Sequence, residues 1–366
     1  MEISFNRLDR GYKKYKSEYD NAVIDTLESG HYILGSRVKK FEVEFSDYLD
    51  IKYCVALNSG LDALILAFRA LGIGHGDEVI VPANTYIASV IGITENGATP
   101  IFVEPDEYYN IDANKIEEKI TDKTRAILVV HLFGQAAEMS KIKDISIKHN
   151  LFLVEDCAQS HGAISNEFVT GTWGDIGCFS FYPTKNLGAF GDAGAIVTNN
   201  EKIFEKIKMM RNYGSRIKYQ HEIVGINSRM DEIQAALLSV KLKHYKDLRT
   251  EREDIALKFL EGINNSAIEL PKIREGLEHV WHLFVVRTNE RNHFQNYLQD
   301  NGISTQVHYP IPIHLSEAYA YLGHMVGSYP IAEYYSEHMI SLPLYEGMAE
   351  DEIQYVIDVI NQYKET

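Results

Sequence analysis

The 366-residue chain has few cysteines and no long apolar run. Its three cysteines are odd in number, lack the spacing of metal ligands and lie in apolar contexts, so we expect reduced core thiols at Cys54, Cys157 and Cys178. No apolar segment approaches the roughly 20 residues that span a bilayer, and the opening MEISFNRLDRGYKKYK lacks the apolar centre of a secretory leader. We therefore expect a cytoplasmic protein without a membrane partner.

Positive charge is also scarce. Lysine and arginine number 36 against 52 aspartates and glutamates, a formal net charge of −16. Binding to nucleic acid or to an anionic membrane surface usually requires a basic face, so we expect neither partner. Local backbone and side-chain geometry must hold any anionic ligand. Because the sequence has no internal repeat and no low-complexity linker, it indicates an ordinary globular protein.

Strand-like and helix-like segments alternate through the first two thirds of the chain. The strand candidates are nearly continuous apolar runs at residues 53–57, 77–82, 99–105, 124–134, 151–157, 176–182 and 193–198. The helix candidates lie at residues 12–29, 61–72, 85–97, 113–120, 139–150 and 201–211. This alternation predicts an α/β fold with a mostly parallel central sheet covered by helices on both faces, and an antiparallel orientation is open for the strand at 193–198.

The C-terminal third has a different organisation. A long helix at about 230–260 suits a connection between domains, and segments 280–288, 293–302, 304–310 and 351–363 form a smaller α/β unit after it. A chain of 366 residues is also long for one domain. We predict a large domain at residues 1–245 and a small C-terminal domain at residues 246–366.

Open parallel sheets bind ligands beyond the carboxyl ends of their strands, and polar clusters occur at those places here. Ser59 and Gly60 lie between the strand YCVAL and the helix that follows it. A helix that begins after such a turn offers free N–H groups and the positive end of its dipole, which suits a phosphate. Ser59 as an ordinary N-cap and Gly60 as a tight turn explain this motif equally well.

The stretch EDCAQSHGA ends another buried strand with two adjacent carboxylates. Side chains alternate along a strand, so Glu155 and Asp156 should face opposite sides of the sheet and cannot form a catalytic pair. Asp156 needs a cationic or N–H partner in this apolar setting, whether as part of a site or as a structural cap. No second histidine lies at metal-ligand spacing from His161, so we expect a packed histidine and no metal site.

Lys185 lies among aromatic residues, glycines and a proline in FSFYPTKNLGAFGDAG. A lysine in a low-dielectric setting loses its proton more easily, and the neutral amine is the nucleophile that forms a Schiff base with a carbonyl. A lysine whose stem packs on aromatics while its ammonium reaches water is the structural alternative. A lysine, a strand-end acid and a phosphate-type helix start in one sheet are together what a pyridoxal phosphate site requires.

Two further segments have both functional and structural explanations. Tyr86 in PANTYIASV lies at a loop-to-helix transition, where its ring can stack on a heterocycle or simply pack in the core. Residues 211–236 form a polar, tyrosine-bearing segment before a helix resumes. Long loops in compact domains are often functional, although flexible surface also accounts for this one.

Taken together, these motifs resemble the fold-type-I pyridoxal phosphate enzymes of the sugar aminotransferase family named after DegT, DnrJ, EryC and StrS. The resemblance extends from SGHYILG (29–35) to the last helix. Its most specific parts are ALNSGLDAL, GDEVIVPANTYIAS, VVHLFGQ, EDCAQSHGA, FSFYPTKNLGAFGD, GINSRMDEIQAA and VHYPIPIHL. The resemblance implies an aspartate-aminotransferase-like fold and pyridoxal 5′-phosphate as cofactor, with pyridoxamine 5′-phosphate formed during the reaction.

The resemblance also implies roles for individual residues. Lys185 would bind the cofactor covalently and move protons, Asp156 would pair with the pyridine nitrogen, and Gln159 with the ring hydroxyl. The remaining cofactor contacts would be Tyr86 on the ring face, Ser59, Gly60, Leu61 and Ser180 at the phosphate, and Asn227 reaching the phosphate from a partner subunit. The substrate cleft would be lined by Tyr182, Tyr213, Tyr219, His308 and Tyr309, in a homodimer with shared active sites.

Two positions depart from the pattern of this family. Leu61 stands where threonine is more usual, so only the backbone N–H remains for a phosphate there, and Ala193 stands where glycine is usual. Relatives that dehydrate their substrate carry histidine at the lysine position, whereas this chain keeps Lys185. The resemblance therefore favours transamination over dehydration.

The segments KNLGAFGDAG, HLFGQ and HYPIPIHL resemble those of family members that act at C3 of the sugar. The expected reaction is transfer of an amine from glutamate to a nucleotide-linked 3-keto-6-deoxyhexose, with thymidine diphosphate as the nucleotide, in deoxyamino sugar and glycan or lipopolysaccharide biosynthesis. Alternatives are a uridine diphosphate-linked 3-ketouronic acid, a 4-keto-6-deoxyhexose, or a non-catalytic sugar-nucleotide-binding protein. A dehydrogenase is disfavoured because no G-x-G-x-x-G follows the first strand.

Overall fold

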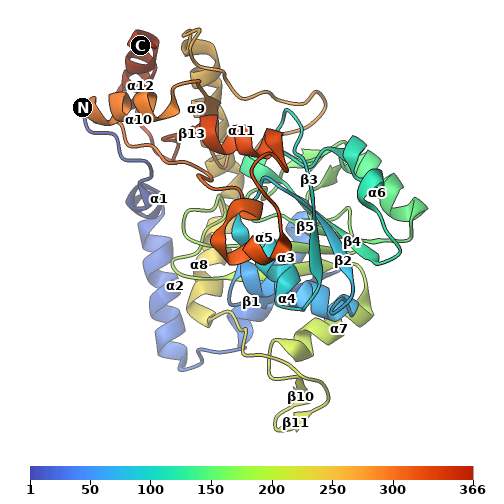
Figure 1. Cartoon of the computed structure of the whole chain (residues 1–366). Helices are drawn as coiled ribbons and strands as arrows, with labels where there is room; N and C mark the ends of the chain where they lie inside the picture. Colours follow the sequence, from blue (N-terminus) through green and yellow to red (C-terminus); the bar gives the residue numbers. More distant parts are fainter. Residues whose placement is uncertain (366) are drawn as a thin grey trace.

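A computed structural model describes residues 1–365 of the chain. Its centre is a seven-stranded sheet (Figure 1). The strands lie in the spatial order β1 (Tyr53–Leu57), β9 (Gly194–Thr198), β8 (Ile176–Ser180), β5 (Phe152–Asp156), β4 (Thr124–Val130), β2 (Glu78–Pro82) and β3 (Thr99–Val103). Only β9 is antiparallel to its neighbours in this sheet. The sequence leaves this orientation open for the strand at 193–198. The predicted α/β fold with a mostly parallel sheet is confirmed.

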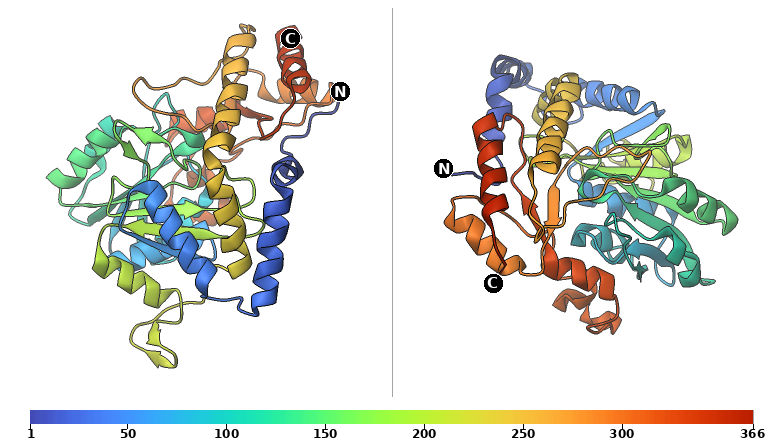
Figure 2. Two further views of the ribbon diagram at one scale, coloured as in Figure 1. Left: turned by 180° about the vertical axis from the view of Figure 1, so that it is seen from behind. Right: turned by 90° about the horizontal axis from the view of Figure 1, so that it is seen from above.

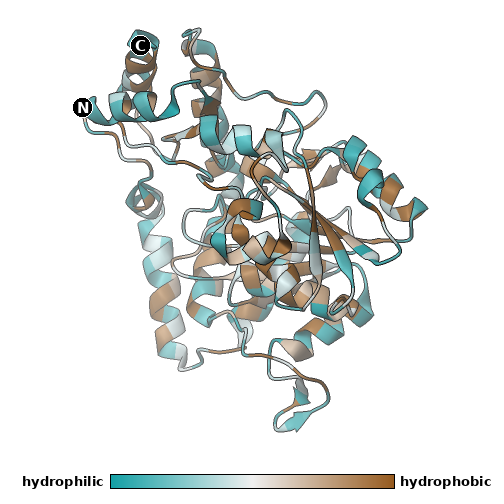
Figure 3. Cartoon of the chain, in the orientation of Figure 1, coloured by the Kyte–Doolittle hydropathy of each residue, from teal (hydrophilic) through white to brown (hydrophobic). Residues whose placement is uncertain are grey.

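Helices cover both faces of the sheet because the strand side chains are apolar on both faces. Much of the sheet is accordingly coloured brown, for hydrophobic residues, in Figure 3. On one face lie α4 (Gly60–Leu71), α5 (Ile87–Thr94) and α7 (Glu201–Met210). On the other lie α3 (Ser36–Leu49), α8 (Glu232–Lys243) and α6 (Met139–Lys148). The alternation is visible in β1, where Val55 packs toward α4 while Cys54 and Ala56 pack toward α3.

A smaller unit packs at one end of the large one, and both termini lie beside it (Figures 1 and 2). Its core surrounds the antiparallel pair β12 (Phe284–Arg287) and β13 (Met339–Leu342). Its helices are α9 (Tyr245–Gly262), α10 (Arg291–Asp300), α11 (Pro330–His338) and α12 (Glu350–Gln362). Ile3 is buried in this core and pairs with Ile303, so the first residues of the chain pack with the small unit. The division at residue 245 stays a prediction.

Two predicted helices are each broken into two. The segment 12–29 contains parts of α1 (Leu8–Lys14) and α2 (Lys16–Ser29), and the helix expected at 230–260 is divided between α8 and α9. The breaks fall at Tyr15 and His244, whose rings stack on each other at 3.8 Å. The two breaks therefore lie side by side in the fold, and the periodicity of either segment alone does not show them.

Other differences concern short elements. Residues 113–120 form two 3₁₀ turns, Ala113–Lys115 and Glu117–Lys119, where an α-helix was expected. The segment 211–236 contains a hairpin, β10 (Ser215–Ile217) with β11 (Gln220–His221), which projects from the body (Figure 1). Helix α3 and a second small hairpin, β6 (Ile164–Ser165) with β7 (Phe168–Val169), were not predicted. Within the described residues, no helix combines the length and apolar character required to cross a membrane.

Candidate active site

Lys185 lies in a compact loop that follows β8. The loop turns at Tyr182, whose carbonyl accepts the Lys185 N–H at 2.8 Å, and returns to the sheet where the Ala189 N–H donates to the Phe181 carbonyl at 2.8 Å. Gly188 permits this return, because a Cβ there would lie 2.4 Å from the carbonyl oxygen of Pro183. The loop therefore holds the base of the Lys185 side chain rigidly above the carboxyl ends of the strands.

The environment of Lys185 favours the neutral amine. Burial lowers the pKa of Lys185 to about 8, and the nearby carboxylate of Asp156 limits this decrease. Burial also lowers the pKa of three neighbouring histidines, to about 3 for His161, to about 4 for His308 and well below the ordinary range for His282. These imidazoles are therefore neutral near pH 7, and Asp156 is the acid that opposes the lowering of the Lys185 pKa.

Asp156 ends β5 on the face of the sheet that α5 covers. Its Oδ2 accepts a hydrogen bond from Ser89 Oγ at 2.8 Å, and its Oδ1 accepts the Ala158 N–H at 3.1 Å. Burial raises the pKa of Asp156, whereas these two donors and the Lys185 charge lower it. The geometry leaves a buried, oriented carboxylate that can hold a protonated ring nitrogen.

Glu155 faces the other side of the sheet, as strand alternation predicted. Its carboxylate accepts backbone N–H groups from Gly171, Trp173 and Gly174 at 2.8 Å each. His131 Nε2 lies 3.0 Å from Glu155 Oε2, and His131 Nδ1 accepts the Ala137 N–H. Although His131, Glu155 and Cys157 lie close enough to share a metal ion, hydrogen bonds already use both ring nitrogens and the carboxylate. We therefore interpret this cluster as structural support for β5.

Gln159 connects the end of β5 to the small unit. Its Nε2 donates to the hydroxyl of Tyr309 at 3.2 Å, and its Oε1 accepts the Phe133 N–H at 2.6 Å. The Tyr309 ring lies 5.1 Å from the ring of Tyr86, which begins α5 and remains half-exposed. His308 and Tyr309 thus lie beside Lys185, Asp156 and Gln159, although they are more than 120 residues away in sequence.

The start of α4 lies against β8 and β9. Ser59 Oγ accepts the Asp62 N–H at 3.1 Å, so Ser59 is an N-cap. A Cβ on Gly60 would lie 2.5 Å from the Cβ of Ser180, and one on Gly194 would lie 2.7 Å from the Gly60 nitrogen. These glycines allow the backbone to approach closely, and the structure brings the Gly60 and Leu61 N–H groups and the Ser180 hydroxyl to one corner of the site.

Four predicted site residues lie outside this cluster. Tyr182 is half-exposed at the loop before Lys185, and Asn227 is exposed beside Ser228. Tyr213 and Tyr219 lie at or beside the projecting hairpin, and Tyr219 is 82% exposed. Within one chain these side chains do not meet Lys185. The contribution of Asn227, Tyr213 and Tyr219 to a neighbouring subunit stays a prediction, as does the role of Tyr182 in the substrate cleft.

Sequence reasoning missed several residues that shape the site. Ser89 holds Asp156 and lies within the motif PANTYIAS, three positions after Tyr86, so helical spacing could have indicated it. Asn186 donates to the Val280 carbonyl at 2.7 Å and contacts His282 Nδ1 at 3.1 Å. No sequence pattern indicates His282, because only folding of the segment after α9 brings it to Lys185.

This set of residues fits pyridoxal 5′-phosphate. It combines a lysine that loses its proton readily, a buried carboxylate for the ring nitrogen, an amide N–H for the ring hydroxyl and a glycine-lined helix start for the phosphate. The half-exposed Tyr86 ring is free to stack on the ring of the cofactor. Fold and site together define a pyridoxal phosphate-dependent aminotransferase of fold type I.

Comparison with known proteins agrees with this class. Residues 13–361 match the DegT/DnrJ/EryC1/StrS aminotransferase family, and the chain belongs to this family. It is 50% identical to dTDP-3-amino-3,6-dideoxy-alpha-D-galactopyranose transaminase of Aneurinibacillus thermoaerophilus, over 99% of both chains. The crystal structure of DesV from S. venezuelae, in complex with a ketimine intermediate, matches with a TM-score of 0.97 and 43% identity over 99% of this chain and 98% of that one.

A third relative shows the cofactor. The structure of ntda from Bacillus subtilis contains bound PMP and matches with a TM-score of 0.92 and 32% identity, over 98% of this chain and 84% of that chain. The predicted family, fold and cofactor are therefore confirmed.

Proposed function

We propose that this enzyme transfers an amino group to C3 of a thymidine diphosphate-linked 3-keto-6-deoxyhexose, with glutamate as the amino donor. The observation that carries the chemistry is the half-buried Lys185, whose pKa is lowered to about 8 although the nearby carboxylate of Asp156 opposes the decrease. The substrate is supported by the Aneurinibacillus transaminase, since half of all positions are identical over the full length of both chains. The C3-type segments of the sequence support the same position of amination.

Lys185 is the group that moves protons in this proposal. With a pKa of about 8, about 9% of the side chain is neutral at pH 7, against about 0.03% for a lysine with its ordinary value. Pyridoxal phosphate, when bound, supplies a ring that accepts the electron pair left on the carbon next to the reacting nitrogen when that carbon loses its proton. Lys185 would move a proton between the substrate carbon and the cofactor carbon on the two sides of the reacting nitrogen, which requires the amine to lie within hydrogen-bond reach of both carbons.

The surrounding residues hold the reacting groups. Asp156, oriented by Ser89, keeps the ring nitrogen protonated, and Gln159 donates an N–H to the ring hydroxyl. The Gly60 and Leu61 amides with Ser59 and Ser180 bind the phosphate. The ring of Tyr86 packs on the cofactor face, and His308 with Tyr309 borders the sugar.

The functional unit in this proposal is a homodimer with shared active sites. The partner subunit's Asn227 reaches the phosphate, and the partner subunit's hairpin brings Tyr213 and Tyr219 to the sugar nucleotide beside Tyr182. The projecting position of the hairpin and the exposure of its apolar Ile217, at 60%, support this arrangement. We also propose a cytoplasmic location and a role in deoxyamino sugar synthesis for glycans.

The test combines colour and product analysis. The purified enzyme with pyridoxal phosphate should be yellow, and excess glutamate should bleach it. Incubation with glutamate and thymidine diphosphate-linked 3-keto or 4-keto sugars, or a uridine diphosphate-linked 3-ketouronic acid, should give an amino sugar from the first substrate, identified by mass and NMR. Product from only a 4-keto or only a uridine substrate would overturn the proposed specificity.

A lysine variant tests the mechanism separately from the substrate. Lys185→Ala should bind pyridoxal phosphate noncovalently and should not turn over. After borohydride treatment, which converts a lysine-bound imine to a stable amine, the variant should lose the cofactor on gel filtration in denaturant while the wild type retains it. Undiminished transamination by this variant would exclude Lys185 as the catalytic group.

A further inference from the structure

The side-chain amide of Gln159 has a defined orientation. Its Oε1 accepts the Phe133 N–H at 2.6 Å, and a backbone N–H can only donate. The Nε2 must therefore point the other way, toward the Tyr309 hydroxyl at 3.2 Å and into the site. A backbone amide outside the site thus decides which end of the Gln159 side chain faces the reacting groups.

The N–H of Phe133 is held in place by an unusual backbone conformation. Phe133 has φ 60° and ψ 0°, in the left-handed region that non-glycine residues rarely adopt. Such a conformation is energetically unfavourable and persists only where the surroundings enforce it. The Phe133 ring packs edge-on against Tyr109 at 5.4 Å, and Tyr109 is itself left-handed, with φ 70°.

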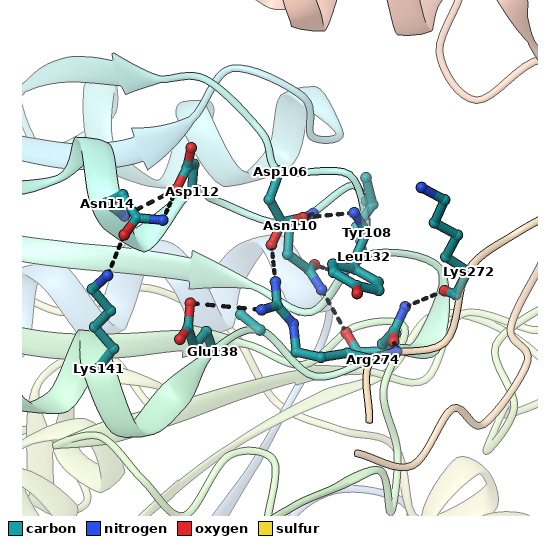
Figure 4. Close-up of polar contacts among 12 residues, drawn as sticks. Asp106, Tyr108, Asn110, Asp112, Asn114, Leu132, Glu138, Lys141, Lys272 and Arg274 are labelled. Atoms are coloured by element: carbon teal, nitrogen blue, oxygen red, sulfur yellow. Dashed lines mark hydrogen bonds and ion pairs between the residues drawn. The ribbon is translucent and has the colours of Figure 1, made fainter. Parts of the chain in front are cut away.

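The buried side chain of Asn110 forms hydrogen bonds on both sides of this turn. Asn110 Oδ1 accepts the Leu132 N–H at 2.9 Å, and Asn110 Nδ2 donates to the Gln135 carbonyl at 3.0 Å (Figure 4). Asn110 is itself placed by Asp106, whose Oδ1 accepts the Asn110 N–H at 3.1 Å. The amide of Asn110 therefore fixes the backbone on both sides of Phe133.

The side chain of Gln135 ties the same turn to the segment that leads into the small unit. Gln135 Oε1 accepts the Arg274 N–H at 2.6 Å, and Gln135 Nε2 donates to the Lys272 carbonyl at 3.1 Å. The Leu283 N–H donates to the Phe133 carbonyl at 3.2 Å.

Arg274 anchors this segment to the large unit. Its guanidinium pairs with Asp106, lies 3.6 Å from Glu138 and covers the ring of Tyr108 at 4.2 Å (Figure 4).

We propose that Asn110 and Gln135 are positioning residues for transamination: they hold the left-handed turn at Phe133, so that Gln159 presents an N–H to the ring oxygen of the cofactor. This inference rests on the proposed contact between Gln159 and that oxygen. A donated N–H stabilises negative charge on the oxygen, whereas a rotated amide would place a carbonyl against it. When the turn relaxes, Gln159 loses its fixed orientation and the ring oxygen becomes more basic.

The test is a pH titration of the visible absorption band of each pyridoxal phosphate-loaded enzyme without substrate. A more basic ring oxygen holds the proton of the lysine-bound nitrogen more strongly, so Gln159→Ala should raise the apparent pKa of this band. Asn110→Ala and Gln135→Ala should raise it in the same direction, by about 0.5, corresponding to part of one hydrogen bond. Asn265→Ala, which removes comparable amide-to-backbone bonds in the small unit, should titrate like the wild type.

Each outcome distinguishes the inference from the proposed function. An enzyme that acquires no visible band with pyridoxal phosphate would contradict the cofactor chemistry itself. If the apparent pKa of the visible band shifts in Gln159→Ala but in neither Asn110→Ala nor Gln135→Ala, only the positioning role is overturned. If it does not shift in Gln159→Ala, the proposed contact between Gln159 and the ring oxygen is overturned. If one of these variants folds poorly, Gln135→Glu replaces it, because glutamate keeps the acceptor for the Arg274 N–H. Backbone amides of residues 131–136 should then exchange with solvent faster in Gln135→Glu than in the wild type.

Discussion

Lys185 should destabilise the fold that carries it, so its replacement by methionine should stabilise the cofactor-free protein. Methionine keeps an unbranched apolar stem in the loop and removes the charge. The lysine charge is unfavourable in the folded chain because burial lowers the pKa of Lys185 from 10.5 to about 8 even with Asp156 nearby. Active sites often retain such unfavourable groups because function requires them.

The magnitude follows from the pKa change. A decrease of about 2.5 corresponds to about 3 kcal/mol at pH 7, where both the folded and the unfolded lysine are protonated. Partial contact of Lys185 with solvent reduces this figure, so we expect Lys185→Met to raise the free energy of unfolding by about 2 kcal/mol. Between pH 8 and pH 10.5, position 185 binds more protons in the unfolded chain than in the folded one. The free energy of unfolding of the wild type therefore rises with pH in this range, and the difference in stability between Lys185→Met and the wild type becomes smaller.

Urea denaturation of cofactor-free wild type and Lys185→Met at pH 7 and pH 10.5, at one protein concentration, measures both effects. Lys123→Met, at an exposed lysine, is the matched control and should change stability by less than about 0.5 kcal/mol. Equal stability of Lys185→Met and wild type at pH 7, or an advantage that does not shrink at pH 10.5, would refute the argument that burial of the charge is costly.

Three further predictions concern two residues that hold the site, Ser89 and Gly60, and Glu232, whose carboxylate accepts backbone N–H groups at the start of α3. Ser89→Ala removes a donor from the buried Asp156, so kcat should fall about tenfold in steady-state assays, and an unchanged kcat would contradict its role. Gly60→Ala places a Cβ 2.5 Å from Ser180 Cβ, so pyridoxal phosphate titrations should show at least tenfold weaker binding, whereas wild-type affinity would contradict a close approach. Glu232→Ala leaves the N–H groups of Gly35, Arg37 and Val38 without their acceptor. Urea denaturation should therefore show a free energy of unfolding lower by about 3 kcal/mol, and a decrease below about 1 kcal/mol would exclude the capping role of Glu232.

Much of the fold was predictable because local and global preferences agree. The strands of the central sheet are apolar on both faces, and this pattern indicates parallel strands between two helix layers. The errors occur where distant segments decide the outcome. The breaks at Tyr15 and His244 lie side by side, although the two residues are more than 220 positions apart. The two 3₁₀ turns at 113–120 bury Ala113 and Ile116 against β2, β3 and β4, which the helical pattern does not reveal.

The candidate site divides in a similar way. The motif around Lys185, the acid at the end of β5 and the helix start at Gly60 were recognisable because each lies in a short segment with its own chemical character. Ser89, Asn186 and His282 were not, since an ordinary serine, asparagine or histidine acquires a role only from what it contacts.

The class of fold, the family and the cofactor could be predicted before folding is considered, because strand patterns and short motifs are local properties of the chain. The folded chain was needed to show that the surroundings of the lysine lower its pKa, that Ser89 donates a hydrogen bond to the carboxylate of Asp156, and that His308 and Tyr309 from the small unit lie beside Lys185 and Gln159. The physical reason is that pKa values and side-chain orientations depend on burial and on partners from distant segments, which exist only after the chain has folded.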